Sequence, residues 1–490
     1  MNLNNKDKLM NIIRKINQLH EEDEHKKIIE IITSIPNEEM NTELFSLLAR
    51  AYNNTEEYDK ALDNLMYIRE ECIDDNLWNY RVGYAYYYNG NKENAEIYFK
   101  KAYDLDNEDS DAYNFYILCS EDRDEGINFE KRVNIFWKWF EENEKIISDF
   151  IEKKSSMSSD EIAEFVSEGT LLISNDLQFN FGGNYEFIFT IEGKEYLFYL
   201  TPRIVSAMPD KLKSKWKFFP YMPKQNVENF NFKIYDKDFS FEEILVYAEF
   251  NKDADSFNLK FYNEKLNELE EDYAYNTFYI MLEHAIGENI AKFYLGEALK
   301  SYEKLDGMIE LTKLYDFIID ILKNRDKKII EEPTERYSFY ERKPYDNYLR
   351  DDIFMGNSCY MGLVYDFYNY NYDALVKISK MGARAVYLHY HFYENKDNDF
   401  DDENINKILL NERDNITDDI ENIMGEKGSG KEIGIILGSA FGTLGGYIDL
   451  LLYNQDEFIK RAEEVLKNYN YKFSLLRFRQ YSEIIKEFND

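Results

Sequence analysis

The first part of the chain has the apolar spacing of amphipathic helices. Residues 6–20 and 25–34, the second stretch ending before Pro36, predict one helix pair, and residues 41–109 predict two more. Residues 109–125 predict a further helix that covers the end of this array. The pattern therefore predicts an all-helical N-terminal region.

After about residue 130 the spacing of apolar residues changes, first over two further helices and then to the two-residue alternation of strands. Residues 132–153 and 159–173 predict two amphipathic helices, the first with a dense aromatic start. Residues 177–200 then alternate apolar and polar side chains between short glycine turns, which predicts a three-stranded antiparallel meander. Further strands are expected near 229–236, 243–250 and 256–262, and helices over 264–323. Helices segregated from an antiparallel sheet indicate an α+β domain.

A charged stretch that contains Pro333 and Pro344 and has no sustained period predicts a domain boundary near residue 332. Beyond it strands and helices interleave, which indicates an α/β or α+β domain. Strands are expected at 337–342, 357–366, 383–393, 432–438, 447–453 and 472–478, and helices at 371–381, 404–423 and 455–468. The chain thus divides into helical repeats (1–125), an α+β domain (126–332) and a C-terminal domain (333–490).

A 34-residue repeat lies within the helical region. Tyr52 and Tyr86 are 34 residues apart, and so are Ala61 and Ala95. The second repeat also carries Gly83 and Ala102, which let two antiparallel helices approach closely, Phe99, which fills the space between them, and a turn glycine, Gly90. This spacing resembles the tetratricopeptide repeat over residues 41–109, and it implies stacked helix pairs.

The resemblance also implies a binding groove lined by the first helix of each pair. Three- and four-residue spacing places Glu43, Ser46, Arg50 and Asn53 there in one repeat, and Leu77, Tyr80, Tyr84 and Tyr87 in the next. Three tyrosines on one stripe offer rigid apolar area with hydroxyl groups, as protein-binding hot spots do. The alternative is that they pack against an adjacent helix or the middle domain. Arg50 alone would be a weak anchor for an anion.

Composition and charge narrow the class of partner. The chain has 490 residues, 44% of them hydrophobic, so it can bury sizeable cores. With 59 basic and 95 acidic side chains the net charge is −36, which argues against nucleic acid and anionic membranes as partners. The charge is spread along the chain, which fits either ordinary solubility or neutralisation of a basic protein, for example by an immunity protein that binds a toxin.

Cysteine usage and the N-terminus indicate the compartment. Cys72, Cys119 and Cys359 are scattered and lack CxxC spacing, so neither a disulfide framework nor a cysteine zinc site is expected. The first residues show no apolar signal segment. We expect a cytoplasmic protein, and its richness in Asn, Ile, Lys and Tyr suggests an AT-rich bacterial genome.

Two glycine motifs resemble functional segments, a phosphate-binding loop and a membrane span, but the neighbouring sequence disfavours both. Gly425 to Lys431 matches GxxxxGK, but a helix is expected before it, a strand after it, and Glu432 occupies the hydroxyl position, so a flexible turn is favoured over a nucleotide site. The glycines between Gly434 and Gly446 interrupt a run too short to span a membrane. Two buried strands joined by a Gly-rich loop explain the run, and that loop could also line a pocket.

The only weak metal candidates are His389 and His391, which strand alternation would place on one face. No third ligand can be assigned, and two half-buried polar residues packed among tyrosines are the favoured explanation of the pattern. Residues Asp397 to Glu403 lack the glycine and the final acid of a calcium loop, so a solvated acidic loop is expected.

These patterns favour an adaptor that binds a protein or peptide through a repeat groove made of Arg50, Asn53, Leu77, Tyr80, Tyr84 and Tyr87. No catalytic residue and no cofactor is predicted, and the oligomeric state is not indicated. The competing hypothesis is an enzyme, or a protein that binds a metal or small ligand, with its site in the C-terminal domain.

Overall fold

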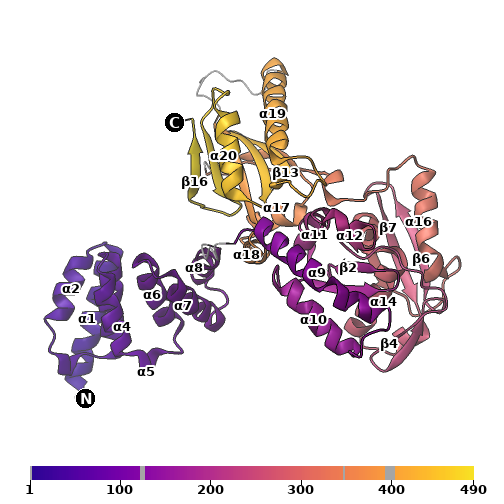
Figure 1. The fold of residues 1–490 in the computed structure, drawn as a ribbon. Coiled ribbons are helices and arrows are strands. Elements are labelled where there is room, and N and C mark those ends of the chain that lie inside the picture. The colour runs from indigo at the N-terminus through magenta and orange to yellow at the C-terminus, as the bar shows by residue number, and fades with distance from the viewer. Residues whose placement is uncertain (1–2, 122–126, 346–347, 392–402, 490) are drawn as a thin grey trace. The chain divides into compact units, whose positions relative to one another are not determined.

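The computed structural model describes residues 3–121, 127–345, 348–391 and 403–489. The chain forms two compact units, residues 1–126 and 127–490 (Figure 1). The division of the second unit at residue 332 stays a prediction. The acidic segment from Asp397, apart from Glu403, lies outside the described residues.

The N-terminal unit consists of helices arranged in pairs. Its helices are α1 (Leu3–Glu21), α2 (His25–Thr33), α3 (Thr42–Asn54), α4 (Tyr58–Tyr67), α5 (Arg69–Cys72), α6 (Asn76–Tyr88), α7 (Lys92–Leu105) and α8 (Ser110–Glu121). The side chains of Asn41, Asp75 and Asn91 accept hydrogen bonds from backbone N–H groups in the first turns of α3, α6 and α7. These caps explain why the helices begin where they do.

Each helix pair packs on the next. α1 contacts α2, α3 contacts α4 and α6 contacts α7, while α2 contacts α3, α4 contacts α6 and α7 contacts α8. Trp78 of α6 is buried, and its indole N–H donates to the Leu65 carbonyl of α4 at 3.0 Å. Gly83 faces Phe99, whose ring would lie 2.8 Å from an added Cβ, so only glycine permits this close approach. The N-terminal region is therefore helical, as expected.

The second unit begins with two helices over a small sheet. α9 (Phe129–Ile151) and α10 (Ser159–Leu171) precede β1 (Gln178–Gly182), β2 (Glu186–Thr190) and β3 (Lys217–Phe219). The aromatic start of α9 packs on this sheet, with the Phe140 ring centroid 5.0 Å from that of Phe218 and the Trp137 centroid 4.7 Å from it. Burial against the sheet thus explains the dense aromatic start.

The expected third strand of the meander is wrong. Residues Glu195–Tyr199 form a 3-10 helix, η2, and the third strand is β3, which pairs with β2 in parallel. Residues 196–199 are all buried, and a continuous apolar run of this length does not distinguish a strand from a helical turn.

A four-stranded sheet, in the order β8-β7-β6-β9, follows. Its strands are β6 (Leu245–Asn251), β7 (Ser256–Tyr262), β8 (Leu295–Lys300) and β9 (Ile309–Glu310), with the separate hairpin β4 (Asn231–Ile234) and β5 (Lys237–Ser240) beside them in sequence. Helices α14 (Glu271–Ile286), α15 (Glu288–Tyr294) and α16 (Leu314–Lys323) complete the segment. Phe261 of β7 stacks on Phe278 of α14 with ring centroids 3.9 Å apart. β8 and β9 correct the expectation that residues 264–323 are helical throughout.

The C-terminal part contains a seven-stranded antiparallel sheet in the order β10-β11-β13-β14-β12-β15-β16. Its strands are β10 (Ser338–Glu341), β11 (Ile353–Ser358), β12 (Arg384–His391), β13 (Gly434–Gly442), β14 (Gly445–Leu452), β15 (Phe473–Arg477) and β16 (Ile484–Phe488). Its helices are α17 (Met361–Tyr368), α18 (Asp373–Lys380), α19 (Glu403–Met424) and α20 (Gln455–Leu466). The described residues of the whole chain therefore form a helical region followed by an α+β region.

Two expectations for this sheet are wrong. Residues 361–366, expected to complete a strand that begins at residue 357, lie in α17, because burial of Leu363, Val364 and Phe367 follows a helical period. The Gly-rich segment is no long loop, since β13 and β14 run on until only residues 443–444 separate them. Among the described helices none is long and apolar enough to cross a membrane.

A buried ion pair lies within the seven-stranded sheet. The Arg350 guanidinium donates to both carboxylate oxygens of Asp449, with Nη2 3.2 Å from Oδ2, and both side chains are fully buried. The guanidinium carbon also lies 4.3 Å from the Phe478 ring centroid and 5.0 Å from that of Phe367. Asp449 thereby neutralises a cation that an aromatic cage removes from water.

We expect Asp449→Asn to lower the free energy of unfolding by about 3–5 kcal/mol, because it leaves the buried Arg350 cation unpaired. Urea unfolding followed by tryptophan fluorescence measures this change. The double variant Arg350→Met with Asp449→Leu removes both charges and should cost less than Asp449→Asn alone. Equal stability of wild type and Asp449→Asn would contradict the assignment.

Candidate functional site

The residues predicted to line the groove lie on α3 and α6, the first helices of their pairs. We call the surface carrying Arg50, Asn53, Leu77, Tyr80, Tyr84 and Tyr87 the α3–α6 face. Leu77 is 51% exposed, whereas Asn53 is buried and donates its side-chain N–H to the Arg81 carbonyl at 3.1 Å. Arg50 and the three tyrosines are half-buried. Asn53 therefore joins α3 to α6, and the other five residues reach solvent in part.

The three tyrosines, Tyr80, Tyr84 and Tyr87, gather around Phe115 of α8. Their ring centroids lie 6.0, 5.7 and 5.2 Å from that of Phe115, all in edge-on geometry. Tyr80 also meets Phe99 of α7 edge-on at 5.6 Å. The tyrosine stripe therefore packs on an adjacent helix along one edge while remaining partly exposed.

The hydroxyl groups of Tyr80 and Tyr84 stay protonated at neutral pH. Burial, with a smaller contribution from neighbouring Tyr88, raises the pKa of Tyr84 to about 12. Burial also raises the pKa of Tyr80. Both side chains consequently offer a neutral hydroxyl beside apolar ring surface, a combination suited to protein contacts.

Arg81, which the sequence analysis did not select, lies beside this stripe. Its Nη1 donates to Ser46 Oγ of α3, and Arg50 Nη2 donates to Asn17 Oδ1 of α1 at 3.4 Å. A signal was available in the sequence: positions three and four residues from Arg50 and Arg81 carry no acid, despite 95 acids in the chain.

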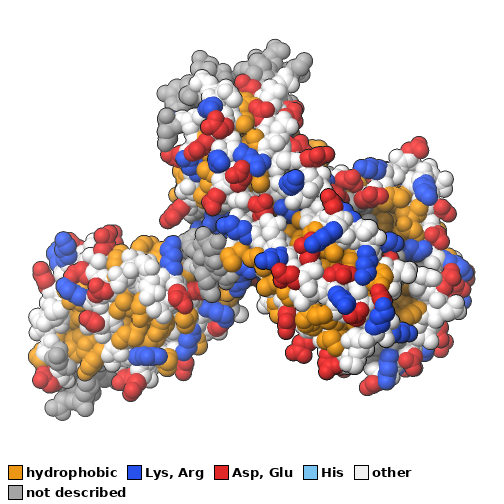
Figure 2. Space-filling model, in the orientation of Figure 1, with side chains coloured by type: hydrophobic (Ala, Val, Ile, Leu, Met, Phe, Trp, Pro, Cys, Tyr) orange, Lys and Arg blue, Asp and Glu red, His pale blue; other side chains and the backbone are white. Residues whose placement is uncertain are grey.

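Acidic and basic side chains are interspersed over the visible face of the molecule, and apolar patches lie between them on the N-terminal unit (Figure 2). No single acidic patch dominates that view. Local partners, more than the net charge, therefore decide what each surface can bind.

His389 and His391 lie on β12 with ring centroids 4.5 Å apart. His389 is fully buried, neither of its ring nitrogens has a hydrogen-bond partner, and its ring lies 4.8 Å from that of Tyr447. Burial, with a smaller effect of His391, lowers the pKa of His389 to about 3. No group of three or more His, Cys, Asp or Glu side chains in the described part of the chain could hold a metal ion.

The GxxxxGK segment is a docked loop rather than a flexible turn. The Glu432 carboxylate accepts hydrogen bonds from Gly428 N at 3.0 Å and from the Ser206 hydroxyl at 3.3 Å, and Oε2 lies 3.9 Å from Arg203 Nε. Gly430 has a φ of +71°, and an added Cβ would lie 2.5 Å from the Ser206 carbonyl. The loop thus binds a carboxylate of its own chain where a phosphate loop would bind its ligand.

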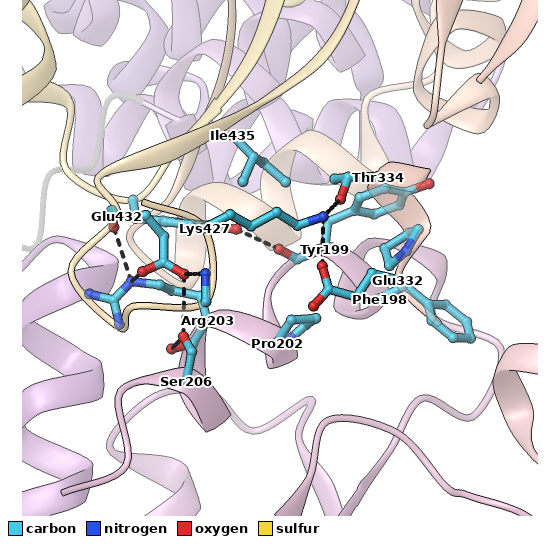
Figure 3. Close-up of a pocket in the computed structure, with 13 residues that line it drawn as sticks. Phe198, Tyr199, Pro202, Arg203, Ser206, Glu332, Thr334, Lys427, Glu432 and Ile435 are labelled. Atoms are coloured by element: carbon cyan, nitrogen blue, oxygen red, sulfur yellow. Dashed lines mark hydrogen bonds and ion pairs between the residues drawn. The ribbon is translucent and has the colours of Figure 1, made fainter. Parts of the chain in front are cut away.

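A small pocket lies where this loop meets α11 (Thr201–Ser206) and the 3-10 helix η4 (Pro333–Glu335). Figure 3 shows Lys427 extending across it toward Thr334 and Glu332, with Nζ 2.7 Å from the Glu332 carboxylate. Its volume of about 50 Å³ suffices for a few water molecules but for no organic ligand. The pocket therefore lies where three segments of the second unit pack together.

A larger cleft of about 230 Å³ lies between α19 and the seven-stranded sheet. It is lined by Tyr337, Asn357, Arg413, Asp414, Thr417, Ile436, Gly438 and Ser439. Arg413 donates to Asp414 Oδ1 through Nε at 2.9 Å and Nη2 at 2.7 Å. Gly438, expected near a possible pocket loop, thus lines a polar cleft from within β13.

Family models, curated proteins and solved structures were compared with the chain, and none of them matches it. The resemblance to the tetratricopeptide repeat consequently rests on the residues and their spacing.

The buried His389 predicts a specific dependence of stability on pH. Its pKa in the folded state is lowered, so below about pH 6.5 the unfolded chain takes up a proton that the folded chain does not. This group should reduce the free energy of unfolding by about 1.4 kcal/mol for each pH unit between pH 6 and pH 4.

Urea unfolding of wild type and His389→Leu between pH 6 and pH 4 measures how the free energy of unfolding changes with pH. The variant should lose the part of this pH dependence that His389 contributes. His391→Gln, which changes an exposed side chain, should retain it. Identical slopes for wild type and His389→Leu would contradict the burial of a neutral imidazole.

Proposed function

We propose that this chain is an intracellular adaptor that binds a protein or peptide through the α3–α6 face of a tetratricopeptide-like helical unit. The observation that carries the proposal is the tyrosine stripe, which presents three half-buried rings on one helix instead of covering them completely. Beside it on α6, Leu77 is 51% and Tyr88 47% exposed.

The physical argument concerns preorganisation. Edge-on contacts with Phe115 hold Tyr80, Tyr84 and Tyr87 in place before a partner arrives, so binding loses little side-chain entropy. Fixed aromatic side chains with a polar tip are enriched at the centres of protein interfaces. The exposed apolar area of Leu77 enlarges the same surface.

A narrower version is that the acidic chain neutralises a basic protein, as an immunity protein neutralises a toxin. The net charge of −36 supports it, because a negative field steers cationic proteins toward the surface. This version adds a partner class and leaves the binding face unchanged.

We expect the triple variant Tyr80→Ala, Tyr84→Ala, Tyr87→Ala to lose a specific protein from an affinity pull-down, since each central aromatic contributes about 2 kcal/mol or more to binding. Quantitative mass spectrometry of the captured proteins measures the loss. Circular dichroism checks that the variant is folded.

Leu77→Glu provides a second test that leaves the aromatic packing intact, because Leu77 is half exposed. It should lose the same protein. Tyr67→Ala is the matched control, since Tyr67 is 76% exposed on α4 and lies outside the α3–α6 face. Equal recovery by wild type, Leu77→Glu and the triple variant would refute the proposed face.

The cleft beside α19 supports a second candidate, binding of a small polar ligand. Its volume of about 230 Å³ and the polar groups of Asn357, Arg413 and Ser439 within a mixed lining suit a compact metabolite. Ser439→Phe should fill the cleft and abolish any rise in thermal unfolding midpoint that a panel of polar metabolites gives with wild type. If no metabolite raises the midpoint of wild type, or if Ser439→Phe responds equally, this candidate fails.

A further inference from the structure

Two arginines at the α3–α6 face, Arg50 and Arg81, donate hydrogen bonds to neutral side chains. Arg50 donates to the amide oxygen of Asn17 and Arg81 to the hydroxyl of Ser46, and both acceptors are neutral. No carboxylate among the described residues lies within ion-pair distance of either guanidinium, although acids outnumber bases 95 to 59 in the chain.

Two buried arginines of the second unit each have a carboxylate close to the guanidinium. Arg350 has Asp449, and Arg203 has Glu432. A guanidinium withdrawn from water without such a partner destabilises the fold. The presence of arginine at positions 50 and 81 therefore needs a reason other than stability.

The two unpaired cations also act on each other. Burial first, and then the positive charge of Arg50, lower the pKa of Arg81 to about 10. Burial followed by the charge of Arg50 also lowers the pKa of His20, and Arg81 contributes to the same shift. Three basic side chains from α1, α3 and α6 thus form one cluster, in which Asp75 partly offsets the charge on Arg81 and Asp23 acts on His20.

We propose that Arg50 and Arg81 bind an aspartate or glutamate side chain of a short acidic segment in the partner, while the tyrosine stripe contacts an apolar residue beside it. This proposal rests on the proposed function and specifies the chemistry of its ligand. The guanidinium fork matches a carboxylate with two parallel hydrogen bonds, which a serine hydroxyl or a single amide oxygen does not satisfy.

The charge of the whole chain limits the length of that segment. A net charge of −36 repels polyanions over long distances, whereas Arg50 and Arg81 act only at contact. A partner that carries one or two carboxylates on an otherwise uncharged or basic surface satisfies both conditions.

Two libraries of acetylated, amidated nonapeptides test the proposal on the full chain. One carries Glu-Glu at its centre and the other Gln-Gln, and neither has another acid. Wild type should retain the Glu-Glu library about tenfold more strongly, because charge-assisted hydrogen bonds to arginine are lost with glutamine. The preference should weaken as salt is raised.

Arg50→Gln with Arg81→Gln should abolish the preference while leaving the thermal unfolding midpoint at or above that of wild type, since like charges are removed and no carboxylate loses a partner. Arg69→Gln is the matched control, because it removes one exposed arginine from the same unit. It should preserve the preference.

Equal retention of the two libraries by wild type would refute the anion site and leave the groove intact. A preference for Glu-Glu that survives Arg50→Gln with Arg81→Gln would also refute it. If wild type retains neither library, the anion site is also refuted. The affinity pull-down with the tyrosine variants then decides whether the groove binds a partner protein.

Discussion

A guanidinium that leaves water needs a counter-charge, and two buried arginines of the second unit, Arg350 and Arg203, have one. Asp449 neutralises Arg350 within the seven-stranded sheet, and Glu432 approaches Arg203 where the glycine loop meets α11. These pairs join segments that are far apart in sequence. In the GxxxxGK segment, the backbone N–H of Gly428 donates to the carboxylate of Glu432.

The N-terminal unit departs from this rule on the surface where a partner would bind. A helix pair buries only part of its apolar surface, so neighbouring pairs stack on each other. One side of the first helix in each pair stays uncovered by this stacking. On α3 and α6 the residue set on this side combines the aromatic side chains of α6 with Arg50 and Arg81. Phe115 holds the rings, while Ser46 and Asn17 hold the arginines without neutralising them.

Sequence patterns located most helices because caps and apolar spacing are local signals, as at Asp75 before α6. They failed at residues 195–199 and 361–368, where buried apolar runs satisfy a strand and a helix equally and long-range packing decides. At the candidate site the tyrosine stripe followed from three- and four-residue spacing. Arg81 did not, because the lack of acids at neighbouring helical positions acquires meaning only beside Ser46 and Arg50 of another helix, 35 and 31 positions away.

The most direct test of the account places a photo-cross-linking amino acid at position 84 of the full chain in its native lysate, with position 67 as the control site. A binding face on α3 and α6 predicts a defined protein cross-linked from position 84 and not from position 67. Cross-links that are absent at position 84, or identical at the two positions, would contradict the central claim that this face binds the partner.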